Sequence, residues 1–332
     1  MSGSPISGER RRAMLRTAMG PAIAAALADP RVIEVMVNPD GALRVDILGE
    51  GRVDTDVRIE PAQVERIIRL VASHARSEVH ADKPIVSAEL PPHDDSAGER
   101  FEGVLPPVSL SPCFSIRKPA ARIYTLLDYV TDGIMSAQAA RILSLAVVDR
   151  KNILVVGGTS SGKTTLANAL LAEMAHLDER VILIEDTREL QCAAPDVVAL
   201  RTRAGSVTIA DLVRSTLRLR PDRIIVGEVR GAEALDMLKA WNTGHPGGIA
   251  TVHANSALSA LYRVEQLVQE AVVSVPRPLI ADAIDLIVFI AGRGLARRVQ
   301  TIARVVGLDP DGGYGLIDIT PQAQSQPLVK GD

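Results

Sequence analysis

The sequence predicts two domains of different fold class: an α+β domain with an antiparallel sheet and helices, followed by an α/β P-loop domain. The chain has 332 residues, which exceeds the usual size of one hydrophobic core. Residues 1–120 contain two helix candidates and several short strand candidates separated by turns, whereas strands and helices alternate along residues 136–320. The stretch GGTSSGKTT at residues 157–165 follows an apolar run and precedes a helix-forming segment, as a phosphate-binding loop does.

The first domain is predicted from local patterns. Residues 10–28 have a helical apolar face, which consists of Met14, Leu15, Ala18, Met19 and Ile23. Arg10-Arg11-Arg12 at its start either contacts an anionic membrane surface or, as we favour, forms a solvated helix end. A second helix begins near Pro61, because Val64, Ile67, Ile68 and Val71 recur at helical spacing. The strand candidates are residues 32–37, 42–47, 85–86, 100–105 and 114–117.

The second domain is predicted from alternation. We expect a linker over residues 121–135, a mostly parallel three-layer domain over 136–320, and a polar, disordered tail over 321–332. Its strands are predicted at residues 153–156, 181–184, 197–200, 224–226, 249–252, 286–290, 298–306 and 314–319. Its helices are predicted near 165–176, 209–219 and 231–242.

The nine-residue loop has the residue types that bind a nucleoside triphosphate. Glycines let successive backbone N–H groups turn toward phosphate oxygens, and the helix that follows directs the positive end of its dipole at the same anion. Lys163 would bind the β- and γ-phosphates, and the Thr164 hydroxyl would bind Mg²⁺. The loop residues are Gly157, Gly158, Thr159, Ser160, Ser161, Gly162, Lys163, Thr164 and Thr165. We therefore expect ATP and Mg²⁺ as ligands.

Three further candidates lie at predicted strand ends, where ligands collect in parallel sheets. Glu185 and Glu228 each come directly after an apolar strand, so one can orient water and the other can hold Mg²⁺. Glu185 is favoured for water and Glu228 for the metal, with the reverse assignment left open. His253 would contact the γ-phosphate, whereas His245, in a Gly-rich turn, is either functional or merely exposed. Metal binding by these histidines is the weaker interpretation, because no cysteine lies near them.

Composition narrows the class of protein. The net charge of −3 and 2% aromatic residues argue against strong direct nucleic-acid binding. Cys113 and Cys192 are far apart, which predicts free thiols in a reducing compartment. Without a signal-peptide core or an apolar run of membrane-spanning length, a cytoplasmic protein is expected.

Four blocks in a fixed order make the chain resemble the secretion ATPases with a RecA-like core, most nearly the TrbB-like conjugative-transfer branch of type IV secretion. The blocks are GGTSSGKTT, LIEDTREL, LRLRPDRIIVGEVRG and TGHPGGIATVHANS, which are similar to the Walker A, Asp, Walker B and His boxes of that family. The segment from Arg100 to Pro119 also resembles that branch. The second acidic block ends in Gly227-Glu228 instead of the aspartate of a general Walker B motif.

The resemblance implies a homo-hexameric ATPase that powers pilus assembly and substrate transfer with inner-membrane partners of a secretion or conjugation machine. It also implies peripheral association with the inner membrane and a nucleotide site that basic residues of the first domain help to close. Arg100 and Arg117 are the candidates, and surface ion pairing is their alternative role. A related pilus-type ATPase or a DNA-translocating RecA-like motor is the alternative function. A kinase, a GTPase and a non-hydrolysing scaffold are disfavoured, because an acceptor lid and an Asn-Lys-x-Asp motif are missing and both glutamates are present.

Overall fold

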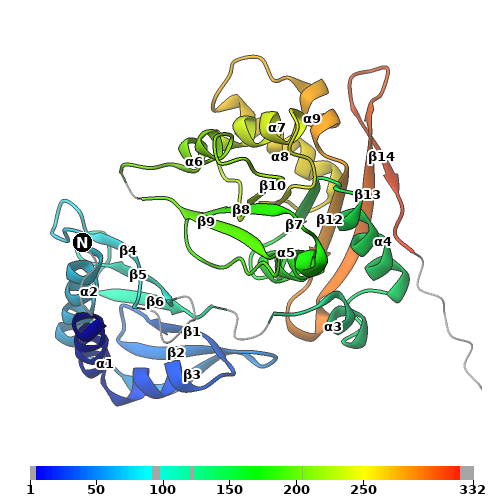
Figure 1. Cartoon of the computed structure of the whole chain (residues 1–332). Helices are drawn as coiled ribbons and strands as arrows, with labels where there is room; N and C mark the ends of the chain where they lie inside the picture. Colours follow the sequence, from blue (N-terminus) through cyan, green and yellow to red (C-terminus); the bar gives the residue numbers. More distant parts are fainter. Residues whose placement is uncertain (1–4, 92–97, 120–122, 204, 322–332) are drawn as a thin grey trace, which may run out of the picture. The chain divides into compact units, whose positions relative to one another are not determined.

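The described residues form two compact units, which divide between residues 122 and 123. The computed structural model describes residues 5–91, 98–119, 123–203 and 205–321, and side chains from residue 13 onward. The predicted tail from residue 322 and the side chains of Arg10-Arg11-Arg12 lie outside the described part. Each unit has its own sheet (Figure 1), as the predicted combination of an α+β and an α/β fold requires, and its own buried apolar residues.

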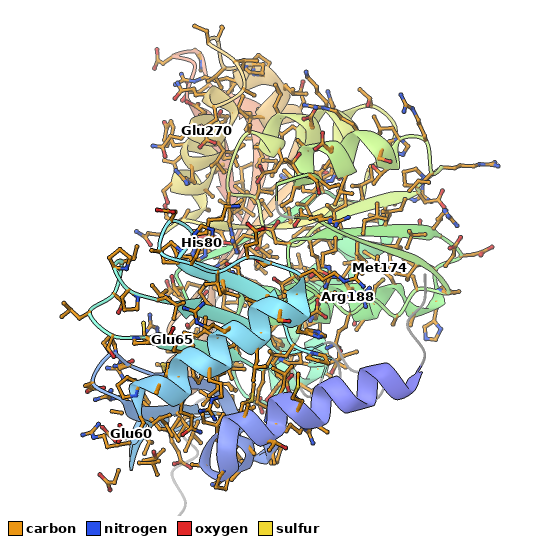
Figure 2. The ribbon with its side chains drawn as sticks, turned by 90° about the vertical axis from the view of Figure 1, so that its left-hand side faces the viewer. Glu60, Glu65, His80, Met174, Arg188 and Glu270 are labelled. Atoms are coloured by element: carbon orange, nitrogen blue, oxygen red, sulfur yellow. The ribbon has the colours of Figure 1, made fainter. Side chains whose placement is uncertain are left out.

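The first unit is a six-stranded sheet with two helices packed on it. Its strand order is β3-β2-β1-β6-β5-β4, and every neighbouring pair is antiparallel. The elements are α1 (Pro5–Ala28), β1 (Val32–Val37), β2 (Ala42–Ile47), β3 (Gly51–Arg58), α2 (Pro61–Ala75), β4 (Ile85–Glu89), β5 (Arg100–Val104) and β6 (Cys113–Arg117). Helix α1 packs against α2 (Figure 2).

Helix α2 follows its sequence pattern closely. Pro61 occupies the first turn, where its missing N–H costs nothing, and the helix buries the four apolar residues predicted for its core face. Glu60 precedes the helix and Glu65 lies on its outer surface (Figure 2).

Helix α1 departs from the prediction in two ways. Gly20 has φ 76° and ψ 172°, so the Gly20-Pro21 pair breaks the predicted continuous helix into two segments. Leu15, Met19 and Ile23 are buried in the core of the first unit. Met14 is 51% exposed, because it lies outside the face of the helix that packs on this core. The predicted apolar face is therefore narrower than the sequence pattern indicated.

The second unit is an eight-stranded sheet in order β14-β13-β12-β7-β11-β10-β8-β9. The six strands β12, β7, β11, β10, β8 and β9 are parallel to one another. Strands β13 and β14 extend the sheet beside β12 as antiparallel strands. The strands are β7 (Ile153–Gly157), β8 (Arg180–Glu185), β9 (Asp196–Arg201), β10 (Arg223–Val226), β11 (Ile249–His253), β12 (Leu286–Ala291), β13 (Arg298–Leu308) and β14 (Tyr314–Asp318).

Helices cover both faces of this sheet, which gives the predicted three layers. They are α3 (Leu126–Thr131), α4 (Ala137–Val148), α5 (Lys163–Ala172), α6 (Ile209–Thr216), α7 (Glu233–Asn242), α8 (Ala257–Gln269) and α9 (Arg277–Ala283). Figure 1 shows α6 to α9 gathered on one side of the sheet. In β7, Leu154 and Val156 join the core under these helices, while Ile153 and Val155 join the core under α3, α4 and α5.

Helix α3 lies within the stretch that the sequence predicted to be a linker. A Thr125–Asp128 capping box begins the helix, and Leu126 and Tyr129 are buried in the core under α4 and α5. Thus residues 126–131 pack as part of the second unit.

Candidate active site

Four parallel strands end at one edge of the second sheet and bring the predicted residues of that unit toward one another. Strands β7, β11, β10 and β8 are consecutive neighbours. His253, the last residue of β11, pairs in register with Gly157, the first residue of the glycine loop. Glu185 ends β8, and Glu228 follows β10 by two residues. The site therefore forms at the carboxyl edge of the sheet, where the strand pattern predicted it.

The glycine loop has the backbone geometry of an anion site. Ser160 and Gly162 both have left-handed backbones, with φ of 61° and 93°. A left-handed conformation is unfavourable for a serine and marks a conformation held by its surroundings. Helix α5 begins directly after Gly162, and within the described residues no side chain caps its N-terminus. The first-turn N–H groups of α5 are thus directed at the position where a phosphate would bind.

Lys163 is held at the centre of the site. The residue is only 7% exposed, and its Nζ lies 3.0 Å from the Gly158 carbonyl oxygen. The same Nζ lies 3.2 Å from Nδ1 and 3.4 Å from Nε2 of His253. The ammonium therefore sits between the glycine loop and the end of β11.

Glu228 is part of the same cluster. Its Oε1 lies 2.8 Å from Nε2 of His253, and its Oε2 accepts a hydrogen bond from Arg230. Burial acts to raise the pKa of Glu228, but the Arg230 hydrogen bond and the nearby positive charges outweigh it, so the pKa lies below the ordinary value. Glu228 is therefore a carboxylate at neutral pH.

The His253 imidazole lies between opposite charges. Partial burial and the Lys163 charge lower the pKa of His253, and the Glu228 carboxylate opposes them without cancelling the effect. His253 is thus neutral at pH 7 and can accept a proton or hydrogen bond on one ring nitrogen while donating from the other.

Glu185 has a different environment. It is 5% exposed, and its Oε1 accepts backbone hydrogen bonds from Glu189 at 2.9 Å and Leu190 at 2.7 Å. Burial raises the pKa of Glu185 to about 7, against the effect of these two hydrogen bonds. A Cβ on Gly227 would lie 3.1 Å from Cγ of Glu185, so the residue before Glu228 must be small to admit this side chain.

Two charged residues of the cluster were not singled out from the sequence. Arg230 bonds to Glu228 and also lies 3.9 Å from Asp186, so it bridges the two acidic blocks. Both residues stand in the quoted motifs, but only strand order could show that β10 and β8 are neighbours. His245 belongs elsewhere, since its Nδ1 lies 2.9 Å from the Pro221 carbonyl oxygen.

Arg100 and Arg117 lie in the first unit, directly opposite each other on β5 and β6. Glu34 and Glu89 are their next register partners, so four charged residues form a row across adjacent strands. Neither arginine forms an ion pair with a described residue at contact distance. The structure therefore places Arg100 and Arg117 next to each other within the first unit.

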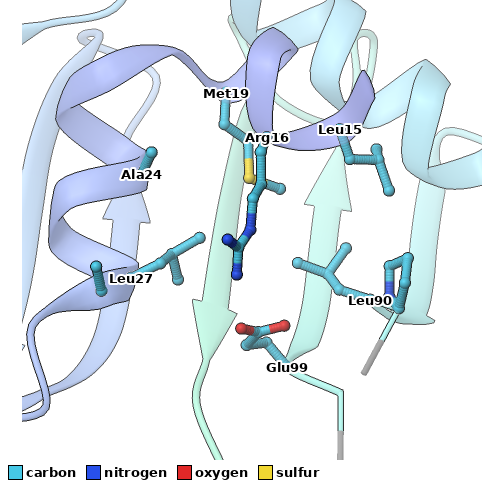
Figure 3. Close-up of a pocket in the computed structure, with 9 residues that line it drawn as sticks. Leu15, Arg16, Met19, Ala24, Leu27, Leu90 and Glu99 are labelled. Carbon is cyan, nitrogen blue, oxygen red and sulfur yellow. The ribbon is translucent and has the colours of Figure 1, made fainter. Parts of the chain in front are cut away.

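A pocket in the first unit does not have the residues for hydrolysis. It is lined mainly by apolar side chains of α1 and the segment after β4, including Leu15, Met19 and Leu90. Figure 3 shows the Arg16 side chain directed toward Glu99. Among the described residues that line the pocket there is a single carboxylate and no imidazole or thiol, so the candidate active site is the glycine-loop edge.

The donors at that edge fit Mg²⁺ better than a transition metal. Thr164 and Glu228 offer oxygen atoms, which Mg²⁺ prefers, and it usually completes its shell with substrate phosphate and water. In the described part of the chain, no three His, Cys, Asp or Glu side chains are grouped to hold a metal alone. Cys113 and Cys192 are both free, as predicted, and none of the described helices is long and apolar enough to cross a membrane.

Known proteins are similar to this chain in sequence and in fold. The family model described as "Type II/IV secretion system protein" matches residues 52–310. The conjugal transfer protein TrbB of Rhizobium radiobacter is 48% identical over 295 residues, covering 88% of this chain and 90% of that protein. The type IV secretion system protein VirB11 of Bartonella henselae is 33% identical over 286 residues, covering 74% of this chain and 78% of that protein.

Among solved structures, the pilus retraction motor PilT with bound ADP has a TM-score of 0.59. It is 20% identical in sequence, and the match covers 91% of this chain and 83% of that one. At this identity the match bears on the fold, and it confirms the two-unit architecture predicted from the sequence. With the family model spanning both units and a relative of 48% identity along nearly the whole chain, this protein belongs to the type II/IV secretion system protein family.

Proposed function

We propose that this protein is the ATP-hydrolysing motor of a conjugative type IV secretion system. The observation that carries the proposal is the Lys163–His253–Glu228 cluster beside the glycine loop. A buried lysine, a neutral imidazole and an ionised carboxylate meet there, at the N-terminus of an uncapped helix. The similarity to TrbB supports the conjugative role.

The chain's own residues divide the work of hydrolysis. The backbone N–H groups of residues 157–165 and the Lys163 ammonium bind and orient the phosphates of ATP. Glu185 accepts a proton from the attacking water, which its pKa of about 7 favours at neutral pH. His253 contacts the γ-phosphate and reports its loss, because it already touches both Lys163 and Glu228. Thr164 and Glu228 would hold Mg²⁺, which when bound neutralises phosphate charge.

We further propose a homo-hexamer at the cytoplasmic face of the inner membrane, acting with membrane components of the machine. Arg100 and Arg117 help to close the nucleotide site during the cycle. Two arginines aligned on adjacent strands suit an anionic ligand, since a guanidinium pair can bind phosphate oxygens in several geometries. Domain closure on ATP and opening after hydrolysis would convert turnover into motion.

A plasmid-transfer assay tests the conjugative role. Donor cells that lack this gene would be complemented with the wild type, with Lys163→Ala, or with Lys151→Ala as the matched lysine control. Transfer restored by the wild type and by Lys151→Ala, but not by Lys163→Ala at equal protein level, supports the proposal. Transfer restored by Lys163→Ala would show that the site is not needed for it.

A further inference from the structure

The loop between β12 and β13 brings an arginine against the glycine loop. Strand β12 lies beside β7 on the side opposite β11, and Arg297 stands at the end of this loop. A Cβ on Gly162 would lie 2.9 Å from Nε and 3.0 Å from Cζ of Arg297. The guanidinium therefore packs on the backbone immediately before Lys163, in space that only glycine leaves open.

The charge of Arg297 is not balanced by a nearby carboxylate in the part of the chain that the structure describes. The Nε atom of Arg297 is buried and has no hydrogen-bond partner among the described residues. Across the described ranges, no carboxylate lies within ion-pair distance of its side chain. A buried donor without an acceptor is energetically unfavourable. A bound ligand that accepts a hydrogen bond from Arg297 would remove this cost.

The surroundings of Arg297 are polar and similarly unsatisfied. The Tyr129 hydroxyl and Ser161 Oγ, the latter in the glycine loop, are buried, and no residue in the described part of the chain forms a hydrogen bond with either. Burial raises the pKa of Tyr129, and the positive charge of Arg297 opposes part of that effect, so the two groups interact electrostatically. This flank of the loop thus offers three polar groups that the described protein does not satisfy.

The two flanks of the glycine loop differ in the part of a nucleotide they can reach. Lys163 directs its Nζ to His253, at the end of β11, so the terminal phosphate belongs on that side. A triphosphate that lies along the loop then has its α-phosphate and nucleoside toward β12. Arg297 lies on this second side, against Gly162.

We propose that Arg297 is a nucleotide-binding residue that contacts the α-phosphate of ATP and of ADP. This inference rests on the proposed ATP site and extends it to a residue outside the four recognised blocks. The contact forms a charge-assisted hydrogen bond to phosphate oxygen, the interaction for which a guanidinium is best suited. Because ATP and ADP share the α-phosphate, Arg297 serves both equally.

Nucleotide affinity tests the inference. Binding of ATP (with Mg²⁺, before turnover), ADP and AMP would be measured by competition with a fluorescent ADP analogue. Arg297→Gln is expected to weaken all three by a similar factor, about tenfold or more. Arg293→Gln is the matched control, because it removes the same charge from an exposed position in the same loop. Arg297→Lys, which keeps the charge, is expected to recover part of the loss.

Two comparisons separate this role from others. His253→Gln is expected to weaken ATP more than ADP, whereas Arg297→Gln leaves the ATP-to-ADP ratio unchanged. Unchanged ADP affinity in Arg297→Gln, or an equal loss in Arg293→Gln, would overturn the inference while leaving the ATP site in place. If the wild type itself binds no nucleotide, the proposed function fails instead. Thermal unfolding without nucleotide shows whether either variant has lost its fold. If Arg297→Gln has, the nucleotide affinity of Arg297→Lys relative to the wild type tests the inference instead.

Discussion

Nε2 of His253 lies 2.8 Å from Oε1 of Glu228, while the same imidazole contacts the Lys163 ammonium. One ring thus joins the residue that would bind the γ-phosphate to the carboxylate that would hold the metal. The register of β11 with β7 fixes this arrangement, because it places His253 opposite Gly157. A change in phosphate charge at Lys163 would therefore alter the electrostatic environment of both His253 and Glu228.

Replacing His253 with glutamine should therefore lower turnover more than it lowers ADP binding. The amide keeps a hydrogen-bonding group near the position of Nε2 but cannot be protonated, and it has no polar atom at the position of Nδ1 to contact Lys163. We expect a fall in kcat of about 10- to 100-fold, measured by phosphate release.

His245→Gln is the matched histidine control, since His245 contacts the Pro221 carbonyl and not the cluster. Equal losses in the two variants would mean that His253 acts through general stability alone.

Glu185 should give the enzyme an acid limb in its pH profile. Its pKa of about 7 means that the carboxylate needed to accept a proton becomes populated as pH rises through neutrality. We expect kcat to increase between about pH 6 and 8, and Glu185→Gln to lose most activity at every pH. A Glu185→Gln variant with a wild-type rate would remove Glu185 from the role of base and favour Glu228.

The same pKa shift predicts a stability effect. Because the folded-state pKa is raised above the ordinary value of 4.5, the folded protein holds this proton more tightly than the unfolded chain. The stabilisation is complete below pH 4.5 and is lost as pH rises through about 7. Glu185→Gln should therefore gain on the order of 3 kcal/mol relative to the wild type at pH 8 compared with pH 4. Denaturant unfolding at the two pH values measures this, and a pH-independent difference would contradict it.

Asn152 should be needed for the stability of the second unit. It is buried just before β7, where Oδ1 accepts from the Gly248 N–H at 2.9 Å and Nδ2 donates to the Ala283 carbonyl at 2.8 Å. Asn152→Leu leaves both backbone groups unsatisfied and should cost about 2–4 kcal/mol. The thermal midpoint would fall by roughly 5–10 °C. A shift of less than a degree would show that water replaces the amide.

Arg100 and Arg117 should matter for turnover and not for folding. Removing both charges, as Arg100→Gln with Arg117→Gln, is expected to raise the KM for ATP or lower kcat by about tenfold or more. Arg52→Gln, an exposed arginine of the same sheet, is the control. Wild-type kinetics in the double variant would leave the two arginines as ordinary surface charges.

Much of the second unit could be predicted because its central strands β12, β7, β11, β10 and β8 are mostly buried on both faces and have continuous apolar runs. The strand ends then located Glu185, Glu228 and His253. Local patterns do not contain the strand order, so they do not predict the contact between Arg230 and Asp186 across neighbouring strands. Arg297 follows a short polar loop after β12, with no motif to single it out, and only the fold places it on Gly162.

The sequence prediction omitted strand β3 and helices α3, α4, α8 and α9, and two of these have little local pattern to mark them. Strand β3 is an edge strand of mostly exposed residues, Gly51–Arg58, and has no buried run to mark it. Helix α3 is only six residues long, and it is stabilised by the burial of Leu126 and Tyr129 in a core formed by distant segments. The formation of these two elements therefore depends on tertiary packing and not on a local sequence pattern.

The most direct test of the central claim is ATP hydrolysis across a gel-filtration profile of the purified protein. The wild type, Lys163→Ala, Glu228→Gln and the Lys151→Ala control would be compared. We predict that phosphate release peaks in a fraction of about six subunits, with at least about a 100-fold loss in the first two variants and none in the control. Hydrolysis that persists in Lys163→Ala would contradict the claim that this glycine-loop site drives the motor.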